Sequence, residues 1–367
     1  MRDLKGKAIE RIVVRGTNWV GDAVMTVPAL RELRRLFPNA HLTLATRSSA
    51  KELFAEADFI DDLLVWDRRG LSSLRAQVRE WKSRNFDLAV LFQNAFAAAL
   101  IPFLARVPFR IGYATERRGF LLTYPIGLPD WRSSKHEVFY YLNLVASLER
   151  LIIGNERAIE DYQPDAQLNI SQSRRAGAAN FLSRQGVKGD GKLIALCPGS
   201  INSRAKRWPA GSFAALADLL IDRQAQVLLI GSPEESEVSL EVARHMRNEP
   251  IMLTGNTTLS QVIEVLDLVD LLITNDTGPA HIAAALGRPT LVIFGPTNPL
   301  TTRPFSASAE IVRHAPECAP CMLRDCPIDH RCMTAISPAE VFARAQAVLG
   351  TQDEVRDPGV QPTGAVA

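Results

Sequence analysis

Several features that mark specialised proteins are scarce or missing in this sequence. The chain has 5 cysteines in 367 residues, too few for a disulfide-dense secreted scaffold. Lys and Arg (42) nearly balance Asp and Glu (40), so the basic excess of a dedicated nucleic-acid-binding protein is absent. The strongest apolar run, FAAALIPFLA at 96–105, is far shorter than the roughly 20 residues that cross a bilayer. These absences argue against a disulfide-rich secreted protein, a dedicated nucleic-acid-binding protein and a membrane-spanning protein.

The length and composition instead fit two globular domains. A chain of 367 residues is too long for one ordinary core, and 47% hydrophobic with 22% charged residues is typical of globular proteins. The N-terminal stretch MRDLKGKAIERIVVRG has scattered charges where a signal peptide has an apolar core. We therefore expect a cytoplasmic protein whose membrane contact is peripheral.

Short β-branched runs alternate with amphipathic segments along most of the chain, which is the pattern of parallel sheets covered by helices. The first half predicts strands at 9–16, 41–47, 62–66 and 87–92, and helices at 22–37, 49–57, 71–84 and 135–150. The pattern restarts at residue 192, with strands at 192–197, 225–232, 250–255, 271–275 and 289–295, and helices at 211–222, from 234, 259–270 and 277–287.

The sequence thus predicts an α/β protein with two doubly wound, Rossmann-like sheets. We expect the first domain at 1–170, including a polar linker at 154–169, and the second at 171–350. The stretch 351–367 is polar and without periodicity, so we expect it to be disordered. Ligands of such sheets bind beyond the carboxyl ends of the strands, so the loops that follow strands are the candidate site.

The loop RGTNWVGDAV (15–24) follows the first strand and contains two glycines and Asp22. One interpretation makes Asp22 a helix N-cap, since its carboxylate accepts backbone N–H bonds. The other makes it a general base that faces a ligand. The spacing is not that of a dinucleotide fingerprint.

Three further loops follow strands of the second half. CPGSINSRAKRWP (197–209) combines small polar residues with basic ones, which suits a phosphate or is simply a solvated basic loop. In IGSPEESEV (230–238), Glu234 and Glu235 are equally placed to bind ribose hydroxyls or only to favour a helix start. Near Thr277 and Gly278 a helix start favours an anion, with His281 as an added donor or a packed core residue.

Two stretches are less settled from the residues alone. RVPFRIGYATERRG (106–119) is arginine-rich and is either an anion-binding region or a solvated loop. ECAPCMLRDCPIDHRCM (317–333) has a spacing that could bind structural Zn²⁺ through Cys318, Cys321, Cys326 and Cys332; free thiols or a disulfide are the alternatives.

Motifs in order along about 9–345 resemble glycosyltransferase family 9, the heptosyltransferases. They are NWVGDAVMTVPAL, CPGS, AKRWP, GSPEE and TNDTGPAHIAAALGRPTLVIFGPTNP. The resemblance implies a GT-B fold, with two Rossmann-like domains facing a cleft. It also implies inverting transfer of L-glycero-D-manno-heptose from ADP-heptose to the lipopolysaccharide inner core. The form of residues 18–22 favours the type II members, whose acceptor is the first heptose on Kdo-lipid A.

The resemblance also implies roles for individual residues. Asp22 matches the catalytic aspartate and Lys206 the catalytic, diphosphate-binding lysine. The donor-binding positions are Ser200, Lys206, Glu235, Asp276, Thr277, Gly278 and His281. The anionic Kdo and lipid A groups give an acceptor-binding role to Asn18, Arg110, Arg117, Arg118, Lys135 and His136. No Asp-x-Asp metal motif stands in a matching place, so we expect transfer without a metal cofactor, at the cytoplasmic face of the inner membrane.

Other functions are compatible with parts of this pattern. Type I or type III members use another acceptor hydroxyl, which the first half of the sequence does not decode. A sugar-nucleotide epimerase or hydrolase would need a second acid–base set, which the sequence lacks. A non-catalytic nucleotide-sugar-binding protein would need neither Asp22 nor Lys206.

Overall fold

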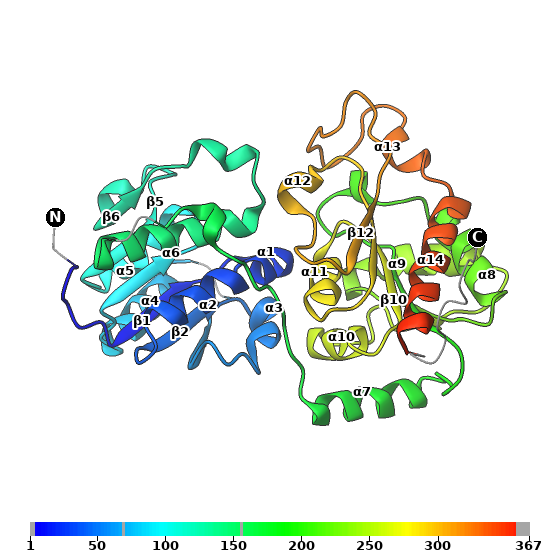
Figure 1. Cartoon of the computed structure of the whole chain (residues 1–367), viewed down its shortest axis with the longest axis horizontal. Helices are drawn as coiled ribbons and strands as arrows, with labels where there is room; N and C mark the ends of the chain where they lie inside the picture. Colours follow the sequence, from blue (N-terminus) through cyan, green and yellow to red (C-terminus); the bar gives the residue numbers. More distant parts are fainter. Residues whose placement is uncertain (1–3, 68–69, 155–156, 357–367) are drawn as a thin grey trace, which may run out of the picture. The chain divides into compact units, whose positions relative to one another are not determined.

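The computed structural model describes residues 4–67, 70–154 and 157–356 (Figure 1). It divides into two compact units. The first comprises Met1–Asn169 and Leu300–Phe305, and the second comprises Ile170–Pro299 and Ser306–Ala367. The short helix α12 (Pro299–Thr302) falls on the boundary between the two units. Within the described ranges, no helix is long and apolar enough to cross a membrane.

The first unit is built on a six-stranded sheet in the order β3-β2-β1-β4-β5-β6, and all its pairs are parallel. Its strands are β1 (Arg11–Arg15), β2 (His41–Thr46), β3 (Asp62–Val65), β4 (Leu88–Leu91), β5 (Phe109–Tyr113) and β6 (Tyr124–Ile126). Its helices are α1 (Val20–Met25), α2 (Val27–Leu36), α3 (Ser48–Lys51), α4 (Leu71–Ser83), α5 (Phe96–Leu104) and α6 (Glu137–Ile153), with 3₁₀ turns η1 (Glu52–Phe54), η2 (Gly119–Leu121), η3 (Asp130–Ser133) and η4 (Ile159–Asp161).

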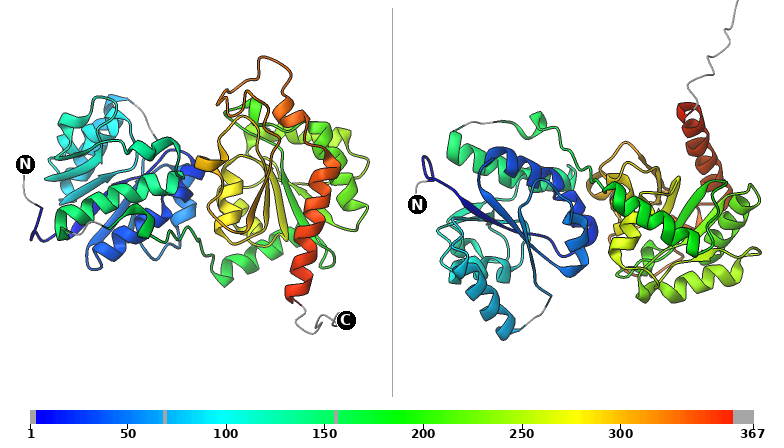
Figure 2. Two further views of the ribbon diagram at one scale, coloured as in Figure 1. Left: turned by 45° about the horizontal axis from the view of Figure 1, so that its top comes forward. Right: turned by 90° about the horizontal axis from the view of Figure 1, so that it is seen from below.

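Helices cover both faces of this first sheet. Figure 2 shows α2 and α6, which pack together, on one face and α4 and α5 on the other. Strand β4 is fully buried and its four residues are apolar, as expected of a central strand in a parallel sheet. Trp81 of α4 and Phe86 pack edge to face beneath β4, with ring centroids 5.9 Å apart.

The second unit repeats the arrangement, with a six-stranded parallel sheet in the order β12-β11-β10-β7-β8-β9. Its strands are β7 (Leu193–Cys197), β8 (Gln226–Leu229), β9 (Ile251–Met252), β10 (Leu271–Asn275), β11 (Thr290–Ile293) and β12 (Ala309–Val312). Its helices are α7 (Gln172–Arg184), α8 (Ala210–Ile221), α9 (Ser236–His245), α10 (Leu259–Leu266), α11 (Gly278–Ala285), α13 (Arg331–Thr334) and α14 (Pro338–Arg356), with 3₁₀ turns η5 (Arg204–Lys206) and η6 (Pro233–Glu235).

Numbered within its own unit, each sheet has the order 3-2-1-4-5-6, which confirms the two predicted doubly wound sheets. In this order the connections leave in opposite directions from the two central strands. The switch points are β1/β4 in the first unit and β7/β10 in the second. Ligands bind beyond the carboxyl ends at such points, so the loops after these four strands define the place to look for function.

Within each sheet, an aspartate forms hydrogen bonds across the amino ends of the two central strands. Asp87, just before β4, accepts backbone N–H bonds from Glu10 and Arg11 at 2.9 Å and donates its own N–H to the Arg11 carbonyl at 2.8 Å. Asp270, just before β10, accepts from Leu193 N–H at 2.9 Å and donates to the Leu193 carbonyl at 2.8 Å. Each aspartate therefore clamps the starts of the two central strands together.

Some predicted elements differ from the structure. The single helix expected at 22–37 is two helices, because Pro28 stands in the first turn of α2 and has no N–H to continue α1. The arginine-rich stretch 106–119 contains β5, whose alternation is obscured by its charged side chain Arg110. The sequence reasoning also did not predict the helices α5, α7, α12, α13 and α14 or the strands β6 and β12.

The end of the chain departs from expectation as well. We expected disorder from residue 351, but α14 continues through Arg356. The residues TQDEVR at 351–356 include neither Pro nor Gly, so nothing in them breaks a helix. The rest of the predicted disordered tail, 357–367, lies outside the described residues.

The aspartate clamp yields a prediction about stability. Asp270→Ala removes the acceptor for the Leu193 N–H, so we expect the free energy of unfolding to fall by about 1–3 kcal/mol. Denaturant unfolding of the full chain measures it. The control is Asp190→Ala, which removes an exposed carboxylate and should change stability by less than about 0.5 kcal/mol. Equal midpoints for the two variants would contradict the clamp.

Candidate active site

Asp22 lies in the first turn of α1, directly after the loop that leaves β1. The N-cap of α1 is Trp19, so the N-cap interpretation of Asp22 is wrong. The half-buried Asp22 carboxylate interacts electrostatically with the side chain of Tyr141 in α6. Burial chiefly, and the Asp22 charge next, raise the pKa of Tyr141 well above its ordinary value. Asp22 is thus a charged group beside the switch point of the first sheet, close to a buried phenol.

The second switch point is occupied by an ion pair. Lys206, at the end of η5, donates from Nζ to Asp276 Oδ2 at 2.8 Å and to the Asp276 carbonyl at 3.2 Å. Asp276 directly follows β10 and is 5% exposed, whereas the Lys206 side chain is 26% exposed. The ammonium is therefore fixed at the strand end, on a side chain that is partly exposed.

Two residues that sequence reasoning missed hold this ion pair in place. Thr297 Oγ1, in the loop after β11, donates to Asp276 Oδ2 at 2.7 Å. Asn275 is fully buried, donates to the Pro198 carbonyl at 2.8 Å and accepts from Trp208 N–H at 3.0 Å. Asn275 thereby ties the end of β10 to both ends of the loop that carries Lys206. Asn275 and Thr297 are small polar residues at or shortly after strand ends, and this was the one feature of the sequence that could have pointed to them.

The basic residues around Lys206 have different tasks. Arg207 donates to the Ser200 carbonyl from Nε and Nη2 at 3.2 and 2.9 Å, which closes the loop on itself. Arg204 forms an exposed ion pair with Asp325 at 2.7 Å. Ser200 is buried, at 4% exposed. The structure therefore singles out Lys206 among these cations as the one held against a strand end.

Glu235 closes the side of this site next to β8. It is 7% exposed, while Glu234 beside it is exposed, which separates two positions that spacing alone left equal. Glu235 Oε2 accepts from Ser232 N–H at 2.9 Å in a capping box. A Cβ on Gly199 would lie 2.2 Å from Glu235 Oε1, so only glycine lets the two loops approach this closely.

The start of α11 is where the sequence predicted it, with Thr277 as N-cap and Gly278 as first residue. No side chain caps this helix, so its first N–H groups are not blocked by a capping residue. Thr277 and Gly278 are half-buried, and His281, one turn later, is buried. Lys206, Asp276 and the α11 start thus combine a fixed cation with the positive end of a helix, which is an anion-binding arrangement.

Comparison with known proteins agrees with this geometry. Residues 74–331, well over half of the chain, match the sequence model of glycosyltransferase family 9 (heptosyltransferase). The chain belongs to glycosyltransferase family 9.

Individual relatives extend the similarity over most of this family 9 chain. It is 30% identical over 326 residues to lipopolysaccharide heptosyltransferase 2 of Salmonella typhimurium, covering 83% of this chain and 88% of that protein. It is 29% identical over 312 residues to lipooligosaccharide heptosyltransferase 2 of Haemophilus influenzae, covering 82% and 88%. Both coverages show that the two units occur together in these relatives.

Solved structures match as well. The structure of ADP-heptose lipopolysaccharide heptosyltransferase II from Escherichia coli superposes with a TM-score of 0.81 at 26% identity, covering 94% of this chain and 99% of that one. A family 9 glycosyltransferase from Veillonella parvula gives 0.80 at 25%, covering 95% and 99%. The two Rossmann-like sheets are thus those of a GT-B glycosyltransferase, and the chain is an enzyme of the heptosyltransferase family.

Most of the predicted acceptor-binding cations have partners inside the first unit. Arg118 is fully buried and its guanidinium binds the carbonyls of Tyr113, Gln93 and Ala95 and Asn94 Oδ1. Burial lowers its pKa to about 10. An acceptor role for Arg118 is therefore wrong: its N–H groups are used in holding loops.

Arg110, Lys135 and His136 are also occupied. Arg110 donates to the Leu121 carbonyl at 2.7 Å. Lys135 pairs with Glu160 at 2.6 Å. His136 is the buried N-cap of α6: its Nδ1 accepts from Val138 N–H at 3.2 Å, and Nε2 donates to the Arg303 carbonyl at 2.6 Å. Burial lowers the pKa of His136, so the ring is held neutral. These three side chains shape the first unit; Arg117 remains exposed.

The four late cysteines are free thiols, and they lie near one another. Burial raises the pKa of Cys332, and the charges of the other three thiolates add to that rise. Nevertheless, among the described residues, no group of three or more His, Cys, Asp or Glu side chains is arranged to hold a metal ion. Cys332 packs into the core beside Gly295 and Met333, whereas Cys318 is exposed.

The cysteine-rich segment instead supports the loop that carries Lys206. Ala205 N–H donates to the Arg324 carbonyl at 2.9 Å, and His330 Nε2 donates to the Ala205 carbonyl at 2.6 Å. Ser203 Oγ adds a bond to the Arg324 carbonyl at 3.2 Å. The cysteine-rich segment therefore holds the Lys206 loop in position, a role that the sequence had not suggested.

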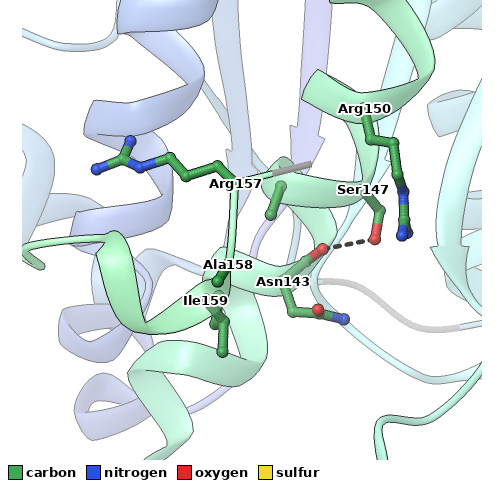
Figure 3. Close-up of a pocket in the computed structure, with 7 residues that line it drawn as sticks. Asn143, Ser147, Arg150, Arg157, Ala158 and Ile159 are labelled. Atoms are coloured by element: carbon green, nitrogen blue, oxygen red, sulfur yellow. Dashed lines mark hydrogen bonds between the residues drawn. The ribbon is translucent and has the colours of Figure 1, made fainter. Parts of the chain in front are cut away.

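A separate hollow of about 250 Å³ lies along α6 and the segment after it. Figure 3 shows the residues around it, which are Asn143, Ala146, Ser147, Arg150, Arg157, Ala158 and Ile159. Ser147 Oγ donates to the Asn143 carbonyl at 2.7 Å, so its polar groups are partly used within α6. None of the predicted site residues lines it.

Proposed function

We propose that this enzyme transfers L-glycero-D-manno-heptose from ADP-heptose to the first heptose of the lipopolysaccharide inner core. The observation that carries this proposal is the Lys206–Asp276 pair beside the start of α11, an anion site at the switch point of the second sheet. The 29–30% identity to heptosyltransferase 2 proteins supports the choice of donor and acceptor.

In this proposal Lys206 and the α11 start bind the ADP diphosphate. As the bond between the sugar and the diphosphate breaks, negative charge grows on ADP, and a fixed ammonium and helix N-terminus stabilise that charge without reorganising. Thr277 and Gly278 lie at the helix start, and His281 lies one turn beyond. Asp276 holds Lys206 in the direction of the phosphates. Ser200 belongs to the loop that carries Lys206, and its carbonyl accepts a hydrogen bond from Arg207.

Glu235 is proposed to accept hydrogen bonds from the ribose hydroxyls. Its Oε2 is engaged by Ser232 N–H, and its Oε1 lies against Gly199. A carboxylate after the second strand of such a sheet is where nucleotide ribose is bound in doubly wound folds. A side chain at Gly199 would collide with the Glu235 carboxylate, so glycine at this position lets Glu235 keep its place.

Asp22 is proposed as the general base. It removes the proton from the attacking acceptor hydroxyl while that oxygen forms a bond to the anomeric carbon. The bond from this carbon to the ADP oxygen breaks on the opposite face, so the configuration inverts. One carboxylate is sufficient for this transfer, whereas inverting hydrolysis uses a carboxylic acid and a carboxylate.

The acceptor series tests this function. Transfer from ADP-heptose is expected only to the acceptor that carries one heptose, not to those carrying none or two, as followed by ADP release and product mass. Asp22→Asn should lower turnover at least about 100-fold while ADP affinity stays within twofold.

Asp130→Asn, an exposed aspartate of η3, is the matched control and should keep full turnover. Transfer to the heptose-free acceptor would assign the first heptose addition instead. Turnover of Asp22→Asn within about tenfold of the unmodified enzyme, about 1.4 kcal/mol, would remove Asp22 from the chemistry.

The proposed diphosphate site is tested by comparing two basic residues of the same 3₁₀ turn, Lys206 and Arg204. Lys206→Ala is expected to weaken ADP binding about 10- to 100-fold, because a charge-assisted bond to the diphosphate is lost. Arg204→Ala removes the same charge from the same turn but from an exposed ion pair, and should leave ADP affinity within twofold. Titration calorimetry with ADP measures both. Equal affinities would place the diphosphate elsewhere.

Peripheral membrane contact belongs to the same proposal, since the acceptor is anchored in lipid. Phe96, Phe103 and Leu104 of α5 and Phe120 of η2 are exposed large apolar side chains. The Phe96 and Phe120 rings lie 6.2 Å apart, so α5 and η2 form one apolar patch. Exposed Arg106 and Arg117 stand next to these elements in the chain. Aromatic side chains beside arginines suit the surface of an anionic bilayer.

Sedimentation with phosphatidylglycerol vesicles tests this contact. Phe120→Ser should reduce the bound fraction, with the partition constant about tenfold lower, because one buried phenyl ring is lost. Leu71→Ser is the control, because Leu71 and Phe120 are both 73% exposed and Leu71 lies on α4 instead. If both variants bind vesicles like the unmodified protein, the patch does not contact the membrane.

A further inference from the structure

Arg15 is a buried cation at the carboxyl end of β1, with only neutral partners. It is 7% exposed. Its Nε donates to Gln93 Oε1 at 3.1 Å and its Nη1 donates to Gln77 Oε1 at 3.5 Å. In the part of the chain that the structure describes, no carboxylate pairs with it. A buried charge without a counter-charge is costly, so its retention calls for an explanation.

Arg118 shows what a purely structural buried arginine looks like in the same unit. Its guanidinium binds four oxygen atoms of the surrounding loops. Arg15 has two such bonds, one of them long, although a guanidinium carries five N–H donors. Arg15 thus keeps donor capacity that the described residues do not use.

A second arginine, which has no acidic partner among the described residues, stands at the end of the neighbouring strand. β1 and β2 pair in parallel, and Gly16 N–H continues the ladder to the Ala45 carbonyl at 2.9 Å, so Arg47 follows β2 at the same edge. Arg47 donates from Nε to Asn18 Oδ1 at 3.3 Å and from Nη1 to the Asp67 carbonyl at 3.0 Å. Burial first, and the charge of Arg47 next, lower the pKa of Arg15 to about 10.

The loop between these arginines also contains an unsatisfied hydroxyl. Thr17 is 6% exposed, and its Oγ1 is buried without a hydrogen-bond partner among the described residues. It lies between Arg15 and Asn18, in the loop that leads to Asp22. Two cations and a hydroxyl donor at the ends of two neighbouring strands have the composition of an oxyanion site, since guanidinium groups bind phosphate and carboxylate through paired N–H bonds.

We propose that Arg15, Arg47 and Thr17 bind a phosphate or carboxylate group of the acceptor and hold the acceptor beside Asp22. This inference rests on the proposed function, in which the acceptor carries Kdo carboxylates and lipid A phosphates. An anion supplies the missing counter-charge and accepts the unused N–H and O–H bonds. None of the three residues was chosen from the sequence, because an arginine that ends a strand looks like any solvated charge.

A binding experiment on the full-length protein tests the site without relying on transfer. The Nε–H groups of Arg15 and Arg47 are hydrogen-bonded, so their signals are observable by ¹H–¹⁵N NMR. Titration with inorganic phosphate, and separately with acetate, should shift both signals. Arg47→Gln should abolish the shift of the Arg15 signal or weaken the anion affinity about tenfold. Arg79→Gln, an exposed arginine of α4, should leave the titration unchanged.

Kinetics provide the second readout. Arg47→Gln should raise the KM for the one-heptose acceptor about tenfold while kcat and ADP affinity stay within twofold, and Arg79→Gln should leave all three unchanged. A loss seen only with the phosphorylated acceptor assigns a lipid A phosphate. An equal loss with a dephosphorylated acceptor assigns a Kdo carboxylate.

Two results overturn the proposal. One is an unchanged acceptor KM in Arg47→Gln. The other is a pair of Arg15 and Arg47 Nε–H signals that respond to neither anion. Absence of heptose transfer by the unmodified enzyme would refute the proposed function instead, and the anion titration would still decide whether the site exists.

Discussion

A buried carboxylate governs the ligand-facing side of the second unit. Asp276 directly follows β10 and is almost removed from solvent, so its charge must be balanced where it stands. Lys206 supplies the positive charge and Thr297 a hydroxyl donor. Because these partners come from the loops after β7 and β11, satisfying one carboxylate brings three strand ends together. The cysteine-rich segment then fixes the Lys206 loop from outside through the Ala205 backbone.

The first unit handles charge in the opposite way. Its buried cations fall into two groups, one fully satisfied by loop carbonyls, as Arg118 is, and one left beside amides and a lone hydroxyl, as Arg15 is. The second unit thus presents a cation already held by its own carboxylate, whereas Arg15 and Arg47 of the first unit have no carboxylate partner among the described residues. This difference matches the proposed ligands: a donor that must be released as ADP after each turnover, and an anionic acceptor that supplies its own charge.

The sequence predicted the fold better than the site. β-branched runs and amphipathic spacing are local signals, so the two doubly wound sheets and the start of α11 at Thr277–Gly278 were readable without structure. The break at Thr26 and the strand β5 were missed because a proline and an arginine disturb the local pattern. Partners far apart in the chain carry no local signal at all. An arginine that holds loops and an arginine without a counter-charge look identical in the sequence, which is why Arg118 was misassigned.

The aspartate clamps lie at the amino edges of the sheets, so the residues that hold the central strands together are separate from those of the candidate sites. Asp87 and Asp270 fasten the central strands at the end away from the candidate site, through hydrogen bonds to the backbone of the neighbouring strand. Cohesion is therefore anchored on one side of each sheet and chemistry on the other. Under the proposed function, substitutions in the carboxyl-edge loops would alter the donor and acceptor sites while the central strand pairs stay fastened. A lineage that keeps these two aspartates has room to diversify its acceptors by loop changes alone.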